Sequence, residues 1–387
     1  MTAPPRGPVL RALAVAILTI GLCWILGGQA LLGRIDPALS VPLLAVPMLA
    51  LGWWQQHEPA PIRRRTALLS LVCVAVAQAL LAYCLAGSAG WSQLALVAGA
   101  GAVAALVADR IVQWRPAFRL LPWLAGLLLV AGWFGAGHGL LAFLYRPAVA
   151  PAGSPVVTIL TGLPLRWPGG SDMAAMIAEG TQDDPALVRI EAAGPVSLVD
   201  SLVDHVPPSG GALLVAHPRA LAPRELVAID AFVRGGGRAV VLADALSGWP
   251  ARHPLGDPRN PPVTSLLTPL LDHWGIVLGA ASADEIAPQA ADIGGTRLHL
   301  FSAGRFVRLS QQCRAYAQHG ILQCRVGAGE VWLVGDADLL FAPLWQPLVP
   351  GAGHLRQADT MEWLTVRLWP GAGERLFHPL WIRSRTI

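Results

Sequence analysis

Residues 212–244 read ALLVAHPRALAPRELVAIDAFVRGGGRAVVLAD, and this stretch predicts the fold of the second half of the chain. Ala212–Ala216 is a wholly apolar run typical of a buried strand, and Arg238–Ala243 contains a second such run. Between them, Pro223–Arg234 has helical spacing and is stopped by Gly235–Gly237, which supply a positive-φ turn before the next strand. Strand, helix and strand in this order predict parallel strands joined by a crossover helix.

The same alternation extends upstream of this stretch. We expect a strand at Val156–Leu160, a helix at Asp172–Glu179, a second strand at Ala186–Ile190 and an amphipathic helix at Ser197–Val206. Together these elements favour an α/β domain with an open, mostly parallel sheet flanked by helices.

Downstream, the candidate strands are expected to pair in antiparallel fashion, which predicts a hairpin addition to the sheet. Candidate strands lie at 297–302, 305–312, 321–326 and 330–334. A closing helix is expected at Ala358–Leu368, with its apolar residues on one face.

Two cysteines of this region are expected to form a disulfide. Phe306–Cys313 and Ile321–Val326 are predicted to pair as antiparallel strands, and a two-residue turn at Gln318 and His319 places Cys313 opposite Cys324. Opposed residues in such a pair have Cβ atoms about 4.5–5.5 Å apart, close to disulfide geometry. The bond would form only in an oxidising compartment, so it also bears on where this domain lies.

The composition indicates that another part of the chain is embedded in a membrane. Of the 387 residues, 54% are hydrophobic and only 13% are charged, and the mean hydropathy is +0.52. Residues 1–150 hold ten arginines and three acids, whereas residues 151–387 hold eighteen arginines and twenty-one acids. The basic pI of about 9.1 therefore comes from the first half of the chain, and we expect no binding to nucleic acid.

Five stretches are long and apolar enough to cross a lipid bilayer, which takes about 20 residues per helix. They lie near 12–33, 38–56, 66–86, 88–108 and 120–145. We therefore expect an α-helical transmembrane domain at 1–146, a Pro-rich linker at 147–155, an extracytoplasmic α/β domain at 156–370 and a C-terminal tail at 371–387.

The arginines also predict the orientation of these spans. Every second loop is basic, and the basic segments contain Arg6 with Arg11, Arg63–Arg65, and Arg110 with Arg115 and Arg119. Because positively charged loops stay in the cytoplasm, the N-terminus is expected inside and the α/β domain outside. For a bacterial chain this predicts a multi-pass protein of the inner membrane with a periplasmic or extracellular C-terminal domain.

The stretch quoted first resembles a known family. Leu213–Leu221, Glu225–Leu226, Ile229–Val233 and Gly235–Arg238 are similar to the exposed domain of Gld-type accessory proteins of ABC transporters, named for gliding motility. Gly327–Asp338 is similar to the last strand and turn of that domain. The resemblance implies a glutamine-amidotransferase-like fold, a role in transport, and ABC-type permease and ATPase subunits as partners.

No set of residues predicts catalysis or a bound cofactor. The turns after the central strands carry no cysteine, no Gly-x-Ser-x-Gly elbow is present, and the histidines are scattered singly. The chain contains no lysine and thus no P-loop, so ATP hydrolysis must come from another polypeptide. We expect no catalytic, metal or cofactor residues, although Asp336 and Asp338 are spaced either to hold a hard cation or to cap a helix.

The residues that remain as candidates for binding a ligand or partner lie in loops after predicted strands: His217, Arg219, Asp244, Asp336 and Asp338. The favoured interpretation is a membrane-anchored, non-enzymatic accessory component of an ABC-type transport or envelope-assembly system. Two alternatives stay open. One is an envelope enzyme that acts on a glycan through these carboxylates, and the other is a regulatory partner of an AAA-type ATPase.

Overall fold

A computed structural model of the chain describes residues 6–118, 120–168, 180–208, 210–251, 253–254, 256–257, 260–281, 287–373 and 377–383. The chain divides into two compact units. The helical unit comprises residues 1–146, 347–356 and 375–387, and the α/β unit comprises residues 147–346 and 357–374.

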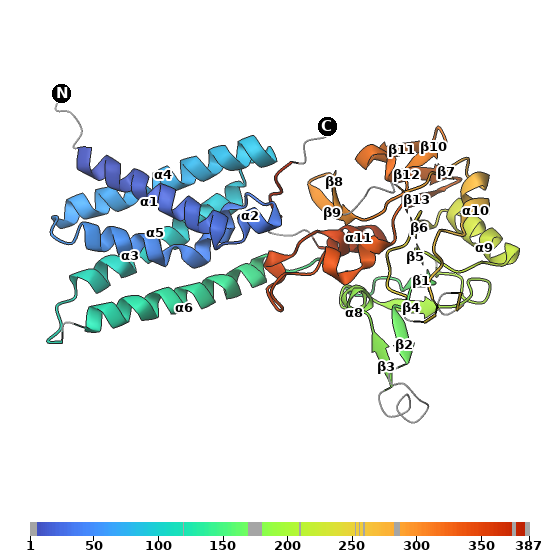
Figure 1. Ribbon diagram of the computed structural model, residues 1–387, viewed down its shortest axis with the longest axis horizontal. Coiled ribbons are helices and arrows are strands. Elements are labelled where there is room, and N and C mark those ends of the chain that lie inside the picture. The colour runs from blue at the N-terminus through green and yellow to red at the C-terminus, as the bar shows by residue number, and fades with distance from the viewer. Residues whose placement is uncertain are drawn as a thin grey trace. The chain divides into compact units, whose positions relative to one another are not determined.

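Among the described residues, four helices of the helical unit are long and apolar enough to cross a membrane (Figure 1). They are α1 (Arg6–Ile25), α4 (Ala60–Ala86), α5 (Trp91–Gln113) and α6 (Leu121–Leu144). A fifth crossing is formed if η1 (Pro37–Leu43) and α3 (Ala45–Trp54), which meet at a bend of 60°, count as one span. The prediction of an α-helical domain with about five apolar helices is confirmed.

Two of the predicted spans differ from the helices in the structure. The first, expected near 12–33, ends at Ile25, and the apolar sequence continues as the short helix α2 (Gln29–Leu32). Gly28, which has a φ of 78°, allows this break because glycine adopts the left-handed region without steric cost. The second, expected near 38–56, is bent because Pro42 lies inside η1 and has no N–H for a regular helix.

The α/β unit contains a seven-stranded sheet in the order β11-β12-β13-β6-β5-β1-β4. The strands are β1 (Val157–Thr161), β4 (Val196–Val199), β5 (Ala212–Ala216), β6 (Arg238–Leu242), β11 (Cys313–Tyr316), β12 (Ile321–Val326) and β13 (Gly329–Val334). All neighbours from β13 to β4 pair in parallel, and only β11, β12 and β13 pair with each other in antiparallel fashion. The predicted mostly parallel sheet with a hairpin addition is confirmed.

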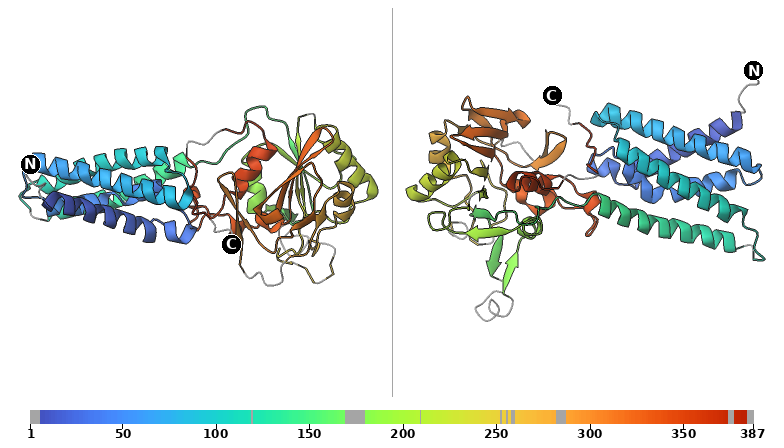
Figure 2. Two further views of the ribbon diagram at one scale, coloured as in Figure 1. Left: turned by 90° about the horizontal axis from the view of Figure 1, so that it is seen from above. Right: turned by 180° about the vertical axis from the view of Figure 1, so that it is seen from behind.

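Helices cover both faces of this sheet (Figure 2). On one face lie α8 (Pro185–Glu191) and α11 (Thr360–Leu368), and on the other lie α9 (Pro223–Arg234) and α10 (Thr268–His273). Each face has its own apolar core because successive residues of a strand point to opposite sides. Leu214 packs towards α8 and α11, whereas Leu213 and Val215 pack towards α9 and α10.

Three two-stranded sheets lie outside the main sheet. They pair β2 (Arg166–Pro168) with β3 (Thr181–Asp183), β7 (Val277–Leu278) with β10 (Phe306–Arg308), and β8 (Gln289–Ile293) with β9 (Thr296–Leu300). The strands predicted at 297–302 and 305–312 are therefore strands, but they pair here and not in the main sheet.

The strand expected at Ala186–Ile190 is a helix in the structure, α8. Asp184 caps this helix, because its Oδ1 accepts a hydrogen bond from the Ala186 amide at 2.8 Å, and Pro185 occupies the first turn. The apolar residues that indicated a strand form the buried side of this helix.

The helix expected at Ser197–Val206 is also wrong. The chain begins here as β4, in which Val196–Val199 pairs with Val157–Leu160 of β1. A β-branched residue at either end of this segment suits a strand, and the prediction gave too much weight to Ser197 as a helix cap. The helix expected at Asp172–Glu179 lies outside the described residues.

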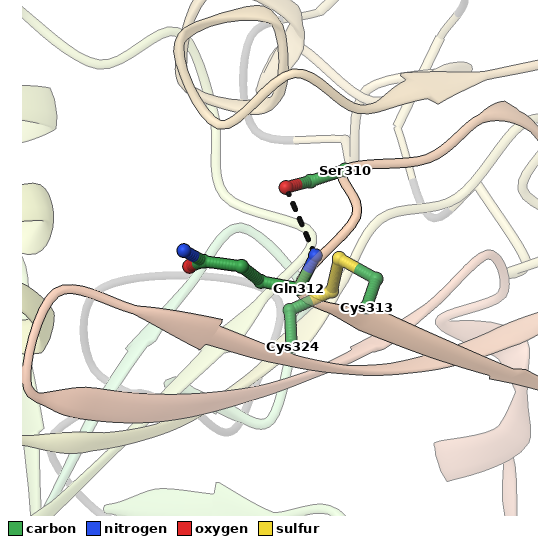
Figure 3. The surroundings of a disulfide bond; sticks show 4 residues. All are labelled: Ser310, Gln312, Cys313 and Cys324. Atoms are coloured by element: carbon green, nitrogen blue, oxygen red, sulfur yellow. Dashed lines mark hydrogen bonds between the residues drawn. A yellow bond between two sulfur atoms is a disulfide. The ribbon is translucent and has the colours of Figure 1, made fainter.

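A disulfide joins Cys313 of β11 to Cys324 of β12 (Figure 3). The register places these two residues directly opposite each other, and Tyr316 opposite Ile321. The expected two-residue turn at Gln318 and His319 is wrong: residues 317–320 connect the strands and include the short helix η2 (Ala317–His319), but the register is the one expected. The strand that carries Cys313 begins at this residue, not at Phe306 as expected, because β10 pairs with β7. Just before Cys313, the Gln312 amide donates a hydrogen bond to Ser310 Oγ at 3.4 Å.

Candidate functional site at the carboxyl edge of the sheet

Four of the residues predicted as ligand or partner residues lie at the same edge of the sheet. His217 follows β5, Asp244 follows β6, and Asp336 and Asp338 follow β13. These three strands are adjacent and parallel, so their carboxyl ends meet. The carboxyl edge of a parallel sheet is the usual position of ligand sites in α/β folds.

Asp244, Asp336 and Asp338 form a buried acid cluster. A carboxylate oxygen of each lies within 4.8 Å of those of the other two, and none of the three residues is more than 2% exposed. Ninety-odd residues separate Asp244 from the other two acids along the chain, and the pairing of β6 with β13 brings them together.

Every carboxylate oxygen of the cluster accepts a hydrogen bond from the loops around it. Asp244 accepts from the Leu246 amide at 3.0 Å and from the Ala337 amide at 3.2 Å. Asp336 accepts from the amides of Phe301 and Asp338, both at 2.7 Å. Asp338 accepts from Ser247 Oγ at 3.2 Å and from the Gly248 amide at 2.5 Å. The cluster therefore ties the loops that follow β6, β9 and β13 to one another.

The cluster retains protons at neutral pH. Burial, followed by the charge of Asp338, raises the pKa of Asp244 to about 8. Burial raises the pKa of Asp338 to about 6, against the lowering effect of the Gly248 and Ser247 hydrogen bonds. Burial and the charges of the other two acids raise the pKa of Asp336 well above its usual value.

The donor set of the cluster resembles that of a hard-cation site, since carboxylate oxygens are the ligands that Ca²⁺ and Mg²⁺ prefer. A cation would first have to displace the protons that these buried carboxyl groups retain. It would also compete with the amides and the Ser247 hydroxyl that already donate to these oxygens. The arrangement is therefore better suited to fixing loops than to holding an ion.

His217 lies at a strained turn at this edge, and among the described residues it has no hydrogen bond to the acid cluster. Its φ is 45°, which is uncommon for a residue other than glycine, and it is fully buried. Its Nε2 lies 2.7 Å from the Pro262 carbonyl oxygen, and burial lowers the pKa of the ring. Arg219, two residues further on, is exposed. Its backbone nitrogen lies close to Gly162, since a Cβ atom added to that glycine would lie only 2.8 Å from it.

A cavity of about 270 Å³ opens beside Asp244, and no pattern in the sequence predicted it. It is lined by Thr264, Ser265 and Thr268 together with apolar residues of α10 and β7. These hydroxyl residues lie in a segment without a recognisable motif, so only the folded chain places them next to the carboxyl edge.

A second polar cluster, which the sequence did not predict, lies in the helical unit. Arg34 and Asp36, both fully buried, form an ion pair with an Nη2 to Oδ2 distance of 2.7 Å. Arg34 Nη1 also donates to the His354 carbonyl oxygen (2.6 Å), and the Tyr145 hydroxyl donates to Asp36 Oδ2 (2.5 Å). The Arg34 guanidinium lies over the rings of Tyr145 and Trp381. Arg34 thus holds segments 347–356 and 377–383 against the helices.

One protein family matches the chain over residues 155–282, about a third of its length. The description of this family is "ABC-type uncharacterized transport system". The matched segment begins two residues before β1 and contains β5, α9 and β6, with His217, Arg219 and Asp244. No curated protein is significantly similar to the chain in sequence.

Several solved structures are distantly similar to the chain. An exo-β-1,4-mannosidase from an Opitutaceae bacterium is 13% identical with a TM-score of 0.31, over 70% of this chain and 49% of that one. A β-galactosidase from Halorubrum lacusprofundi is 13% identical with a TM-score of 0.32, over 63% of this chain and 34% of that one. A cytoplasmic protein from Salmonella typhimurium is 9% identical with a TM-score of 0.31, over 55% of this chain and 97% of that one.

The chain thus spans about half of the mannosidase and about a third of the galactosidase. Structural similarity at this level is too low to indicate a shared activity. The apolar helices fit a membrane protein, and the family match relates residues 155–282 to an ABC-type transport system.

Proposed function

We propose that the chain is a membrane-anchored, non-enzymatic accessory component of an ABC-type transport or envelope-assembly system. In this proposal the α/β unit binds a partner protein or a ligand at the carboxyl edge of its sheet. The observation that carries the proposal is the family match over residues 155–282, because that segment contains His217, Arg219 and Asp244 at this edge.

The geometry of the acid cluster supports a non-enzymatic role. The carboxylates of a glycosidase must flank a sugar and be accessible from solvent. Here the three carboxyl groups are buried and accept hydrogen bonds from the surrounding loops.

We infer further that the α/β unit is of the Gld type, with an amidotransferase-like fold that has lost its nucleophile. In amidotransferases a cysteine occupies a strained turn after a central strand. In this chain the strained residue after β5 is His217, and the Cys313 and Cys324 thiols are joined in a disulfide. A fold of this kind without a nucleophile is suited to binding.

The partners in this proposal are an ABC-type permease and its ATPase. The chain contains no lysine, so it has no P-loop with which to bind and hydrolyse ATP. Its helices provide a route to contact with a permease in the same bilayer.

We further propose that the N-terminus is cytoplasmic and that the α/β unit is periplasmic or extracellular. The three basic loops support this orientation, and so does the disulfide, which persists in an oxidising compartment. A reporter fused after Ile387 should behave as periplasmic and one fused near Arg64 as cytoplasmic. A cytoplasmic signal from the fusion after Ile387 would rule out this orientation.

The proposed binding edge can be tested in living cells by photocrosslinking. A photoreactive amino acid replaces Arg219, which is exposed at the carboxyl edge, and in a matched variant it replaces Ala328, which is exposed in the turn before β13 at the opposite edge. We expect crosslinks to transporter subunits from position 219 and not from position 328. Equal crosslinking from both positions would contradict binding at the carboxyl edge.

A further inference from the structure

A group of arginines lies at the end of the helical unit where α1 begins (Figure 1). Arg63, in the first turn of α4, pairs with Asp109, near the end of α5, at an Nε to Oδ1 distance of 2.7 Å. Arg11, near the start of α1, pairs with Glu58, which lies just before α4, at 3.0 Å. The starts of α1 and α4 therefore meet the end of α5, and we call this region the basic end.

Four further arginines of the basic end are exposed and form no ion pair with any described residue: Arg64, Arg65, Arg110 and Arg115. Residues 1–146 contain three acids, and each is already paired: Asp36 with Arg34, Glu58 with Arg11, and Asp109 with Arg63. The charges of the four exposed arginines thus have no counter-charge within the described part of the chain. A concentration of charge of one sign attracts partners of the opposite sign.

Two of these arginines, Arg65 and Arg110, each stand at the end of an exposed apolar stripe on their own helix. The residues of the stripe are Leu68, Val72 and Val76 on α4, and Val103, Leu106 and Val107 on α5. Their spacing of three or four residues from one to the next places each stripe on the same helix face as its arginine. Because α4 and α5 are long and apolar enough to cross a membrane, such a face suits contact with hydrocarbon chains.

Exposed indole rings lie at the same level as the arginines. Trp54, at the end of α3, is 51% exposed, Trp114, just after α5, is 48% exposed, and Trp123, in the first turn of α6, is 62% exposed. Indole rings favour the boundary between lipid headgroups and hydrocarbon. An open depression of about 370 Å³ also lies here, lined by Trp114 together with Arg110, Ile111 and Gln113.

This arrangement indicates the chemistry of a molecule that would bind at the basic end. The guanidinium groups require an anion, and the planar N–H edges of arginine suit a phosphate group. The apolar stripes that run from Arg65 and Arg110 require hydrocarbon attached to that anion. A phospholipid with a net negative charge has both parts, whereas the ammonium group of a zwitterionic lipid cancels the charge of its phosphate.

We propose that the basic end binds anionic phospholipids. The headgroup phosphates lie against Arg64, Arg65, Arg110 and Arg115, and the acyl chains follow the exposed stripes of α4 and α5. The lipids are bound without any covalent change. This binding depends neither on the proposed transport role nor on which side of the membrane the basic end faces.

The test uses native mass spectrometry of the full-length protein in a nonionic detergent with equal amounts of phosphatidylglycerol and phosphatidylcholine that carry the same acyl chains. We expect phosphatidylglycerol to bind about tenfold more tightly than phosphatidylcholine. Arg110→Gln should reduce this preference about fivefold, whereas Arg110→Lys keeps the charge and should retain most of it. Arg146→Gln is the matched control, because this exposed arginine lies at the other end of α6, over the ring of Phe143, and its replacement should leave the preference unchanged.

Replacing all four exposed arginines by Gln should abolish the preference. Equal binding of the two lipids by the wild type would overturn the proposal and leave these arginines to an acidic protein segment. An unchanged preference in the fourfold variant would also overturn it. Displacement of phosphatidylglycerol by an equal concentration of glycerol phosphate would assign the arginines to a free anion and contradict binding of the lipid.

Unfolding midpoints without added lipid show whether the fourfold variant is folded. If it is not, the comparison of Arg110→Gln with Arg110→Lys, at a single exposed side chain, decides. Equal lipid preference in these two variants would contradict a role for the positive charge.

Discussion

The acid cluster should make the stability of the α/β unit fall as the pH rises from 6.5 to 8. The pKa of Asp244 is raised from its ordinary value of 3.8 to about 8, so the folded chain keeps a proton that the unfolded chain has already lost. Stability is therefore greatest at low pH and is lost progressively as the pH rises towards the folded pKa.

The size of the effect follows from proton linkage. Each proton held only by the folded state lowers the free energy of unfolding by about 1.4 kcal/mol per pH unit. Asp244→Asn removes one such proton. Between pH 6.5 and 8 the variant should lose about 2 kcal/mol less stability than the wild type.

The comparison with Asp244→Asn isolates this group from the histidines. Histidines such as His217 and His299, whose folded pKa values are lowered by burial, still titrate near pH 6.5 in the unfolded state, but they contribute equally to the wild type and to the variant and cancel from the difference. The chain has no lysine to titrate above this pH window. Urea unfolding of the full-length protein in detergent, followed by pulse proteolysis of the α/β unit, measures the free energy at each pH.

Asp230→Asn is the matched control. Burial acts to raise the pKa of Asp230, but hydrogen bonds from Trp274 and Arg234 outweigh it and lower the pKa. Asp230 is therefore ionised in both states throughout the window, and its replacement should leave the pH slope unchanged. An equal slope in the wild type and in Asp244→Asn would refute the argument that the cluster retains a proton at Asp244.

Three further perturbations test other parts of the structure. Arg34→Met should lower the free energy of unfolding by about 3–5 kcal/mol, because it leaves the Asp36 charge buried and unpaired. Arg63→Met breaks a partly exposed ion pair and should lower it by about 1 kcal/mol. Similar unfolding midpoints for the two variants would contradict this. Replacing both Cys313 and Cys324 by Ser should cost about 2–3 kcal/mol in the chain-entropy model, and a stability equal to the wild type in oxidised samples would disprove the contribution of the disulfide. Gly329→Ala should prevent folding of the α/β unit, because the added Cβ would overlap two backbone carbonyl oxygens, and retained protease resistance would show that the turn can move.

The parts of the fold that the sequence predicted correctly have unambiguous local patterns. The predicted helix Pro223–Arg234 has the bounds of α9, and the predicted strand Ala212–Ala216 has those of β5. The apolar spacing of both segments, together with the glycines that follow the helix, admits one interpretation. The opposition of Cys313 and Cys324 was also predictable, because a short turn sets the register of a hairpin.

Short elements could not be assigned in the same way. Ala186–Ile190 and Ser197–Val206 each contain too few residues for helical and strand periods to be told apart, and in the structure the former is helical and the latter begins as a strand. The deciding factors were a cap at Asp184 and pairing with β1. Neither is visible in the hydrophobic pattern alone.

The candidate sites depend still more on long-range contacts. Asp244, Asp336 and Asp338 could be named from their positions after strands, but their proximity follows from the pairing of β6 with β13. The contact between Arg34 and His354 joins residues 320 positions apart, and nothing near either residue in the sequence indicates it.

The central claim, that the chain is an accessory component of an ABC-type system, is tested most directly by purifying the tagged full-length protein from native membranes after mild crosslinking. Mass spectrometry then identifies and quantifies the proteins that accompany it. We predict that an ABC-type permease and its ATPase co-purify in a fixed ratio to the chain. Recovery of an AAA-type ATPase in their place, or hydrolysis of a glycan by the purified chain alone, would contradict this account.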